Sequence, residues 1–408
     1  MTMFGTLRTP RNLVFGAGQR AALPNYVNML GKRALIVTDE RLAADHTFAA
    51  MVDGIRTLGV EAQVFSGTIA ELPASCIAEG VAVGRSFSAD VVIGIGGGSC
   101  IDAAKVIALL LTHGGKAADY YGEFKVPGPV LPLIAVPTTS GTGSEVTPVA
   151  VIADPERAVK VGIASPHLIP HTAICDPELT YSCPPSLTAI SGADALTHAL
   201  EAFTTARRQL TPHIVHEHVF LGKNILSDHY ALFAISHIAA SLKAAYDDGA
   251  HTVARERLML GATAAGLAFG TAGTAAAHAI QYPVGALTHT PHGAGVAVMM
   301  PYVMEFNRSY ARADMAVVAG AMGLETAGMS EDERAGAAID AVAGLFASIG
   351  IPRTIADLGI SRDQLSVVAE QAMGATRLIK NNPRPLDLQS MTSLVTAAFD
   401  GDRERLRG

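Results

Sequence analysis

Four side chains in the second half of the chain have the types and spacing of a metal site. Asp194 and His198 lie four residues apart in a helical stretch, so both leave the same helix face about 6 Å apart. His278 sits in an apolar run, where a buried imidazole needs a polar partner, and His292 lies between a proline and a glycine. One carboxylate and three imidazoles suit Fe²⁺ or Zn²⁺. The sequence therefore predicts one divalent metal site at Asp194, His198, His278 and His292.

Two alternatives stay open for this group. A lone Asp/His pair at helical spacing is more often a surface hydrogen bond than a metal ligand. His289, three residues before His292, is a competing ligand, although it lacks the flanking Pro291 and Gly293. We favour His292, because its flanking proline and glycine fix a sharp entry to the next helix.

Two loops in the first half of the chain predict a dinucleotide site. The glycine loop (residues 96–99) follows a β-branched run and precedes a helical segment, so Gly97, Gly98 and Ser99 lie where a backbone can approach a pyrophosphate. The hydroxyl loop (residues 137–145) carries five hydroxyls and two glycines after another strand. Each loop alone could be only a turn, and the GxGxxG pattern is absent. Together they favour a dinucleotide site.

Asp39 ends the first predicted strand. A carboxylate at that place accepts hydrogen bonds from the adenosine ribose and repels a 2′-phosphate, which favours NAD over NADP. The alternative is that Asp39 only caps the helix that follows.

Two kinds of scaffold must position these residues. Short β-branched runs alternate with helical segments up to about residue 180, which is typical of a parallel α/β sheet. Long helical stretches follow Pro184 and Pro185. We expect a dinucleotide-binding α/β domain at residues 1–181 and an all-helical metal- and substrate-binding domain at residues 182–408. The predicted strands are 33–38, 60–65, 91–95, 131–136, 149–153, 160–164 and 173–175. The predicted helices are 45–58, 74–87, 186–205, 228–245, 253–269, 273–286, 293–307, 331–348 and 386–399.

Composition excludes several classes of protein. Of 408 residues, 49% are apolar and 16% charged, which is incompatible with disorder. The longest apolar run, 106–111, is far shorter than a membrane span of about 20 residues. A net charge of −7 without a basic stripe argues against nucleic-acid binding, and four scattered cysteines indicate neither a disulfide framework nor a cysteine metal site. No secretory signal is visible, so we expect a cytoplasmic protein.

Four segments, in order, resemble the iron-dependent (group III) alcohol dehydrogenase family: GGGSCIDAAK, PTTSGTGSE, GADALTHALEAF and HAIQYPVGALTHTPHG. The similarity extends from residues 15–16 to residues 380–384. It implies a Rossmann-like α/β domain followed by an all-helical domain, the architecture shared with dehydroquinate synthase, and a homodimeric enzyme. The resemblance places the metal on Asp194, His198, His278 and His292. It places the dinucleotide contacts on Asp39, Gly97, Gly98, Ser99, Asp102, Thr138, Thr139, Thr142, Ser144, Lys160 and Leu179.

The activity that the resemblance implies is NAD-dependent interconversion of an alcohol and its aldehyde or ketone, by hydride transfer from a metal-bound alkoxide. The implied metal is Fe²⁺, with Zn²⁺ as an alternative. His278 and Tyr282 are the catalytic candidates. Tyr282 stands where many family members carry a histidine implicated in proton relay or nicotinamide contact, so its phenol either relays a proton or only packs.

The chain departs from the family in a second place. Residues 207–228 look longer than the usual connection and contain His213, His216 and His218. We expect a substrate-mouth or subunit-contact insertion there, rather than a second metal site.

Rival functions stay open. Within the superfamily they are a maleylacetate reductase-like enzyme and a member acting on hydroxy acids. From other classes they are a dehydroquinate synthase-like lyase and a catalytically silent structural protein. Four cationic residues could favour an anionic substrate. The alternative is that all four are solvated surface charges. They are Arg207, Arg208, Arg377 and Lys380.

Overall fold

The computed structural model describes residues 3–154 and 159–407, which form two compact units. The α/β unit comprises residues 8–154, 159–182 and 215–219, and the helical unit comprises residues 3–7, 183–214 and 220–407. The main change of unit falls between Ser182 and Cys183. Two short segments depart from the expected boundaries.

The first of these segments, residues 3–7, belongs to the helical unit although it precedes the first strand. The Ile225 amide donates to the Phe4 carbonyl at 3.1 Å, and the Thr6 amide donates to Asn224 Oδ1 at 3.4 Å. The second segment, residues 215–219, is held in the α/β unit. There Arg8 donates to the Val219 carbonyl at 2.6 Å, and the Val219 amide donates to Glu123 at 2.6 Å. Neither attachment is encoded by local sequence pattern.

The α/β unit is built on a six-stranded sheet in which each pair of neighbouring strands is parallel. Its spatial order is β1 (Asn12–Phe15), β9 (Thr172–Cys175), β6 (Leu133–Pro137), β4 (Val91–Gly96), β2 (Arg33–Val37) and β3 (Glu61–Phe65). Strands β2, β4 and β6 form continuous apolar runs because helices cover both faces of the sheet. The predicted strands are confirmed, whereas β1 was not predicted.

A separate three-stranded sheet joins β5 (Gly122–Glu123), β8 (Val159–Ala164) and β7 (Val149–Asp154). Strands β7 and β8 pair antiparallel. Both were predicted as strands, but alternation with helices alone does not show that they leave the parallel sheet.

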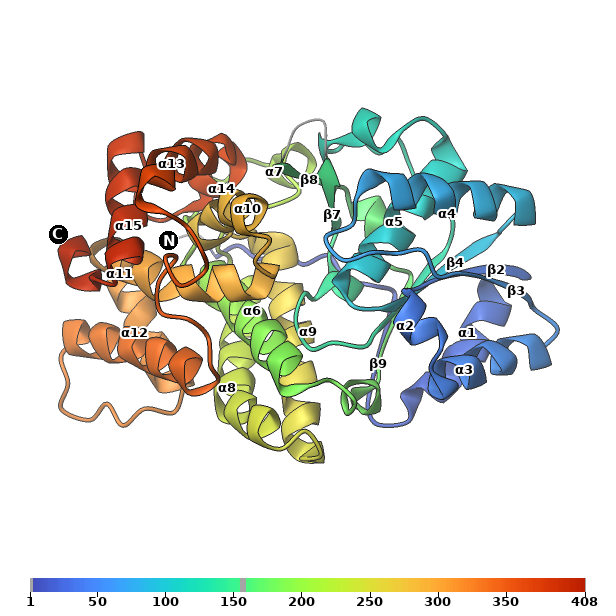
Figure 1. Ribbon diagram of the computed structural model, residues 1–408, viewed down its shortest axis with the longest axis horizontal. Helices are drawn as coiled ribbons and strands as arrows, with labels where there is room; N and C mark the ends of the chain where they lie inside the picture. The colour runs from blue at the N-terminus through green and yellow to red at the C-terminus, as the bar shows by residue number, and fades with distance from the viewer. Residues whose placement is uncertain (1–2, 155–158, 408) are drawn as a thin grey trace. The chain divides into compact units, whose positions relative to one another are not determined.

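Helices lie on both faces of the main sheet. Figure 1 shows α4 (Ala74–Phe87) and α5 (Gly98–His113) on one face and α1 (Leu23–Leu30) and α3 (His46–Thr57) on the other, with the short α2 (Glu40–Ala43) after β2. Two hydrophobic clusters correspond to these faces. The arrangement is the Rossmann-like α/β domain that the sequence predicted.

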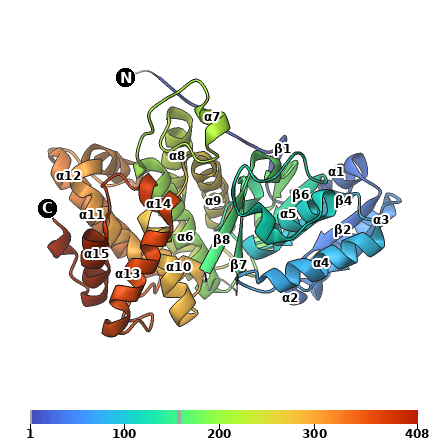
Figure 2. The same cartoon turned by 90° about the horizontal axis from the view of Figure 1, so that it is seen from above.

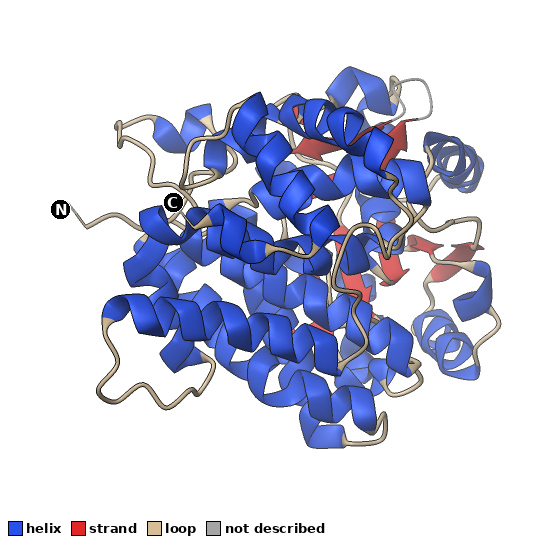
Figure 3. Ribbon diagram, turned by 60° about the vertical axis from the view of Figure 1, so that its left-hand side comes forward, coloured by secondary structure: helices blue, strands red, loops and turns tan. Residues whose placement is uncertain are grey.

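The helical unit has no strand among its described residues. Figure 3 draws the helices of the chain in blue and its strands in red. Its helices are α6 (Pro185–Thr204), α8 (Ile225–Asp247), α9 (Thr252–Ala272), α10 (Ala276–Thr288), α11 (His292–Ala321), α12 (Glu331–Ser348), α13 (Leu365–Gly374), α14 (Thr376–Asn381) and α15 (Leu388–Asp400). The short α7 (Ile214–Glu217) lies at the change of unit.

Helices α6, α8 and α9 pack side by side (Figure 2). Glycines allow the close approach, since a Cβ on Gly192 would lie 2.3 Å from Leu242 Cδ1 and one on Gly261 2.6 Å from Ile238 Cγ1. Among the described residues, no single helix is long and apolar enough to cross a membrane. Helices α9 and α10 pass that test only as a pair bent by 102°.

The prediction of a helix at 273–286 was wrong at its start. Gly273 ends α9 with a φ of +84°, and α10 begins only at Ala276. The chain therefore turns sharply just before His278, and that turn positions the metal-ligand candidate.

Candidate active site

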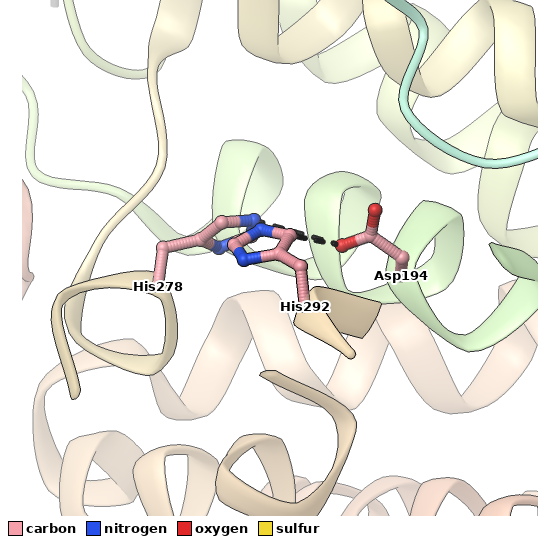
Figure 4. A group of neighbouring side chains, drawn as sticks. All are labelled: Asp194, His278 and His292. Carbon is pink, nitrogen blue, oxygen red and sulfur yellow. Dashed lines mark ion pairs between the residues drawn. The ribbon is translucent and has the colours of Figure 1, made fainter. Parts of the chain in front are cut away.

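Three of the four predicted metal ligands converge in the helical unit. Asp194 on α6, His278 on α10 and His292 at the start of α11 each offer a ligand atom within 4.8 Å of the others. His278 Nε2 lies 3.8 Å and His292 Nε2 4.0 Å from Asp194 Oδ1 (Figure 4). Two ligands of one ion at about 2.0–2.2 Å lie at most about 4.4 Å apart. The spacing therefore fits a single divalent ion between them.

Glycine sets the approach of α11 to α6. A Cβ on Gly293 would lie 2.3 Å from the Ile190 carbonyl oxygen, so any side chain there would push the helices apart. Pro291 immediately precedes α11, and His292 is its first residue. The Pro-His-Gly sequence thus places the His292 ring beside Asp194.

Glu201 holds His278 in one orientation. Its Oε2 accepts from His278 Nδ1 at 2.7 Å and from the Ala275 amide at 2.8 Å, while Oε1 accepts from the Ala277 amide at 2.7 Å. A carboxylate on Nδ1 selects the tautomer that leaves the Nε2 lone pair for a metal. His278 Nε2 is buried and has no hydrogen-bond partner among the described residues. This buried acceptor beside Asp194 is what a metal site requires.

Sequence reasoning did not single out Glu201, although a signal was present. Glu201 follows Asp194 by seven residues, two helical turns along the same face of α6. It is 1% exposed, so its charge is held entirely inside the protein. An acid on the ligand face of a buried helix points to such a supporting role.

His198 lies beside this group without joining it. Its Nδ1 is 3.9 Å from Asp194 Oδ1, but its ring stacks on Phe269 at 4.1 Å and on His278 at 4.6 Å between centroids. Its assignment as the fourth ligand stays a prediction. His289 is exposed and ends α10 with a left-handed φ of 56°, outside the group. Among the described residues, His213, His216 and His218 form no metal-binding group either.

Tyr282 lies one turn after His278 on α10. Its ring centroid is 6.3 Å from that of His292, and it is half-buried against the helical core. Burial raises the pKa of its phenol above the ordinary value. The relay role and the packing role of Tyr282 both stay predictions.

In the α/β unit, the glycine loop and the hydroxyl loop lie against each other. A Cβ on Gly98 would be 2.6 Å from Thr142 Cγ2, whereas one on Gly97 would be 3.7 Å from Thr139 Cγ2. Gly97 occupies the N-cap position of α5. Because glycine has no side chain, it cannot accept a hydrogen bond from the first main-chain amides of the helix. The structure thus brings together the two loops that the sequence paired, and Ser99 lies in the first turn of α5.

Asp102 and Ser144 are bound to each other beneath these loops. Ser144 Oγ donates to Asp102 Oδ1 at 2.5 Å, and the Val151 amide donates to Asp102 Oδ2 at 2.9 Å. Lys105, which the sequence analysis did not single out, donates to Ser144 Oγ at 2.9 Å and to the Thr147 and Val149 carbonyls at 3.0 and 2.7 Å. Burial lowers the pKa of Lys105 to about 8 and raises that of Asp102. The network holds the hydroxyl loop to α5.

Asp39 serves as a helix cap and also lies beside α5. Its Oδ1 accepts from the Leu42 amide at 2.8 Å, while Cys100 Sγ donates to its Oδ2 at 3.8 Å. Burial and then the Asp39 charge raise the pKa of Cys100 to about 12. Asp39 therefore caps α2, as the alternative predicted, and its carboxylate also lies next to the first turn of α5. Its contact with a ribose stays a prediction.

The remaining predicted contacts lie in different surroundings. The buried Thr138 follows β6, and its amide donates to the Gly96 carbonyl at 3.0 Å, so it is continuous with the two loops. Lys160 on β8 forms an ion pair with Glu71. Leu179 packs against the hydrophobic cluster that includes α1 and α3. Their contact with a dinucleotide stays a prediction.

Comparisons with known proteins agree with this geometry. The model for "Iron-containing alcohol dehydrogenase" matches residues 10–177, and that for the "Fe-containing alcohol dehydrogenase family, C-terminal" matches residues 188–399. Long-chain-alcohol dehydrogenase 1 of Geobacillus thermodenitrificans is 35% identical over 93% of this chain and 92% of its own. A 1,3-propanediol oxidoreductase structure superposes with a TM-score of 0.91 at 32% identity, over 97% and 100% of the two chains. The structure of sulfoacetaldehyde reductase from Bifidobacterium kashiwanohense in complex with NAD⁺ superposes with a TM-score of 0.83 at 25% sequence identity. The match covers 98% of this chain and 99% of that chain.

Proposed function

The chain belongs to the iron-containing alcohol dehydrogenase family, and from this premise we propose that Asp194, His198, His278 and His292 hold its metal. The protein is a metal-dependent NAD(H) oxidoreductase that interconverts an alcohol and its aldehyde or ketone. The observation that supports the ligand assignment is the buried Nε2 of His278, oriented by Glu201 toward Asp194.

A bound divalent ion would lower the pKa of the substrate hydroxyl and polarise the product carbonyl. The chain supplies the surroundings for that chemistry. Asp194 contributes the negative charge, and Glu201 keeps the His278 tautomer and ring orientation. Phe269 and the neighbouring apolar helices keep bulk water from the buried side of the site. A His and carboxylate donor set suits Fe²⁺ and Zn²⁺, and affinity alone favours Zn²⁺.

We assign the pyrophosphate of NAD to the start of α5. Gly97 allows close approach of the backbone, and α5 is long enough to give a full helix dipole at its N-terminus. The network of Lys105, Asp102 and Ser144 holds the neighbouring hydroxyl loop in place. Asp39 faces the ribose, so NAD is the preferred cofactor.

Cofactor preference tests the Asp39 assignment. The kcat/KM for NAD should exceed that for NADP, and Asp39→Asn should narrow the ratio by roughly tenfold or more, because it removes the charge and keeps an oxygen that caps α2. A wild-type ratio near one, or one favouring NADP, would show that Asp39 does not read the ribose.

The overall function is tested by NADH formation. Metal-replete enzyme should reduce NAD with a panel of plain alcohols, diols and hydroxy acids. The rate should fall on chelation and return with added Fe²⁺ or Zn²⁺. Net NADH formation excludes a lyase that uses NAD only transiently, and chelator sensitivity excludes a metal-free reductase. No net NADH from any member of the panel would reject the proposal.

A homodimer in the cytoplasm is the expected assembly and location. Light scattering on the purified protein tests the first expectation, and cell fractionation tests the second.

A further inference from the structure

Of the four cations that would favour an anionic substrate, the structure separates one from the rest. Arg207 is 52% exposed and pairs with Asp228 at 3.4 Å, and Lys380 is exposed. Arg208 is half-buried and, like the other cations, lies outside the metal-ligand group formed among the described residues. Arg377 on α14 is half-buried, with its Nη1 atom enclosed by protein and its guanidinium carbon 4.2 Å above the ring of Phe220. Its charge is therefore held in one place.

Arg377 lies against the turn that leads into the metal-binding helix. A Cβ on Gly273 would be 3.4 Å from Arg377 Nη1, and Gly273 has none. Asn381, one turn after Arg377 on α14, donates to the carbonyls of Ala272 and Thr274, both at 3.0 Å. These bonds fasten α14 to the turn.

The same turn is fastened to the metal-ligand group from its other end. The Ala275 amide donates to Glu201 Oε2, the atom that also accepts from His278. Arg377 and His278 are thus attached to one short stretch of backbone, residues 272–278.

We propose that Arg377 binds an acid group on the substrate, at the end remote from the carbon that is oxidised. The substrate class is then short hydroxy acids, and the corresponding aldehyde acids in the reverse direction. The stack on Phe220 covers a face of the guanidinium, while its N–H donors lie in the plane of the group. A planar fork of donors matches a carboxylate or sulfonate, and partial burial strengthens the attraction.

This inference rests on the proposed function, because it names the substrates of the same metal site. The helical unit would then bind the substrate at two points: the metal held by its ligands would bind the hydroxyl group, and Arg377 would bind the acid group. A neutral alcohol of equal length would use only the first of these. The selectivity therefore depends on Arg377 and not on the reacting end of the substrate.

The test compares substrates that differ only in the acid group. The pairs are 4-hydroxybutyrate with 1-butanol and 2-hydroxyethanesulfonate with ethanol, which also distinguishes carboxylate from sulfonate. Wild-type enzyme should prefer the acid member of at least one pair. Arg377→Met should lower kcat/KM for that acid by roughly 10²-fold, mainly through KM, and change the neutral partner by less than about threefold. Arg377→Lys should recover part of the loss.

Lys380→Met is the matched control, since it removes an exposed cation from the same helix and should alter neither substrate. A measurement on the wild type does not depend on how the variants fold: butyrate should inhibit 1-butanol oxidation competitively, and butyramide should not. Equal losses on both members of a pair, or no inhibition by butyrate, would overturn the role of Arg377. Oxidation of neutral alcohols without acid preference would reject this inference alone, whereas no NADH from any substrate would reject the proposed function as well.

Discussion

In the helical unit, Asp194, His278 and His292 come from three helices and meet as side chains in a largely buried group. In the α/β unit, the glycine loop offers main-chain groups between the end of β4 and the start of α5, and the hydroxyl loop lies against it. A side-chain site tolerates little change in the identity of its members, because each donor atom is specific. A main-chain site tolerates little added volume, because the approach of the ligand depends on missing side chains. The two regions should therefore fail in different ways when mutated.

The largest expected effect is at the metal ligands. His278→Ala should leave the metal content well below one ion per chain and lower kcat/KM by roughly 10³-fold or more. The variant loses a metal-ligating nitrogen, and Glu201 loses its hydrogen-bond partner. Elemental analysis of the purified variant measures the first change. His289→Ala is the control and should retain the metal, since His289 lies outside the ligand group. Full occupancy in His278→Ala would refute the ligand assignment.

The α/β unit contains a buried charge network around Lys105, and the contribution of this network to stability depends on pH. Burial lowers the pKa of Lys105 from 10.5 to about 8, so between these values the unfolded chain binds more protons than the folded protein. The free energy of unfolding should therefore rise with pH across that window, by somewhat over about 3 kcal/mol from this group. Lys105→Met removes the group. The free energy of unfolding of the wild type minus that of the variant should grow from pH 8 to 10.5 and stay constant below pH 8. A difference that shrinks across the window would contradict the buried, charged lysine.

Glu201→Gln tests whether the helical-unit site depends on residues behind the ligands. The amide keeps the shape but offers a neutral oxygen to His278 Nδ1, so metal affinity should fall by 10- to 100-fold. Competition with a chelator of known affinity measures this change. An unchanged affinity would mean that packing alone orients His278.

Two adjacent glycines in the α/β unit distinguish a steric clash within the protein from the close approach of a ligand to the backbone. Gly98→Ala should destabilise the protein by about 1–3 kcal/mol, because its Cβ would meet Thr142 at 2.6 Å. Gly97→Ala should leave stability within about 0.5 kcal/mol, since its Cβ meets nothing closer than 3.7 Å. It should still weaken NAD binding by roughly tenfold if the pyrophosphate approaches that backbone. Denaturation curves and NAD titration measure the two effects, and unchanged NAD affinity in Gly97→Ala would place the pyrophosphate elsewhere.

The smallest effect is expected at Tyr282. Tyr282→Phe keeps the ring beside His292 and removes the hydroxyl, so kcat should stay within about threefold of wild type. The pH–rate profile should keep its shape. A loss of 10²-fold with a shifted profile would instead assign the proton relay to the phenol.

Patterns along the chain predicted the sheet strands and most long helices within a few residues. They failed at particular places for physical reasons. β1 is a short edge strand of mixed burial, so it lacks the apolar run that marked β4. The helix expected from Gly273 begins only at Ala276, because the positive φ of Gly273 is a backbone property that apolar periodicity does not report.

For the candidate site, residue types identified Asp194, His278 and His292, and glycine spacing identified the loop before α5. The supporting residues were not found in this way. Glu201 and Lys105 act through partners 77 and 39 residues away, respectively, and nothing in their local sequence marks those partners. His198 stacks on Phe269 and His278 beside these ligands, with its Nδ1 atom 3.9 Å from Asp194 Oδ1, and its assignment as the fourth ligand stays a prediction.

The sequence by itself determined the two kinds of fold and the chemical types of the donors, because helical and strand periodicity, glycine spacing and the coordination chemistry of His and Asp are all local properties. Only the tertiary structure decided which histidine faces Asp194, which acid orients it and which arginine lies beside the turn that carries it. Those choices depend on close contacts between distant segments, such as Gly293 against Ile190 and Gly273 beside Arg377. Contacts of this kind arise only when the whole chain is packed.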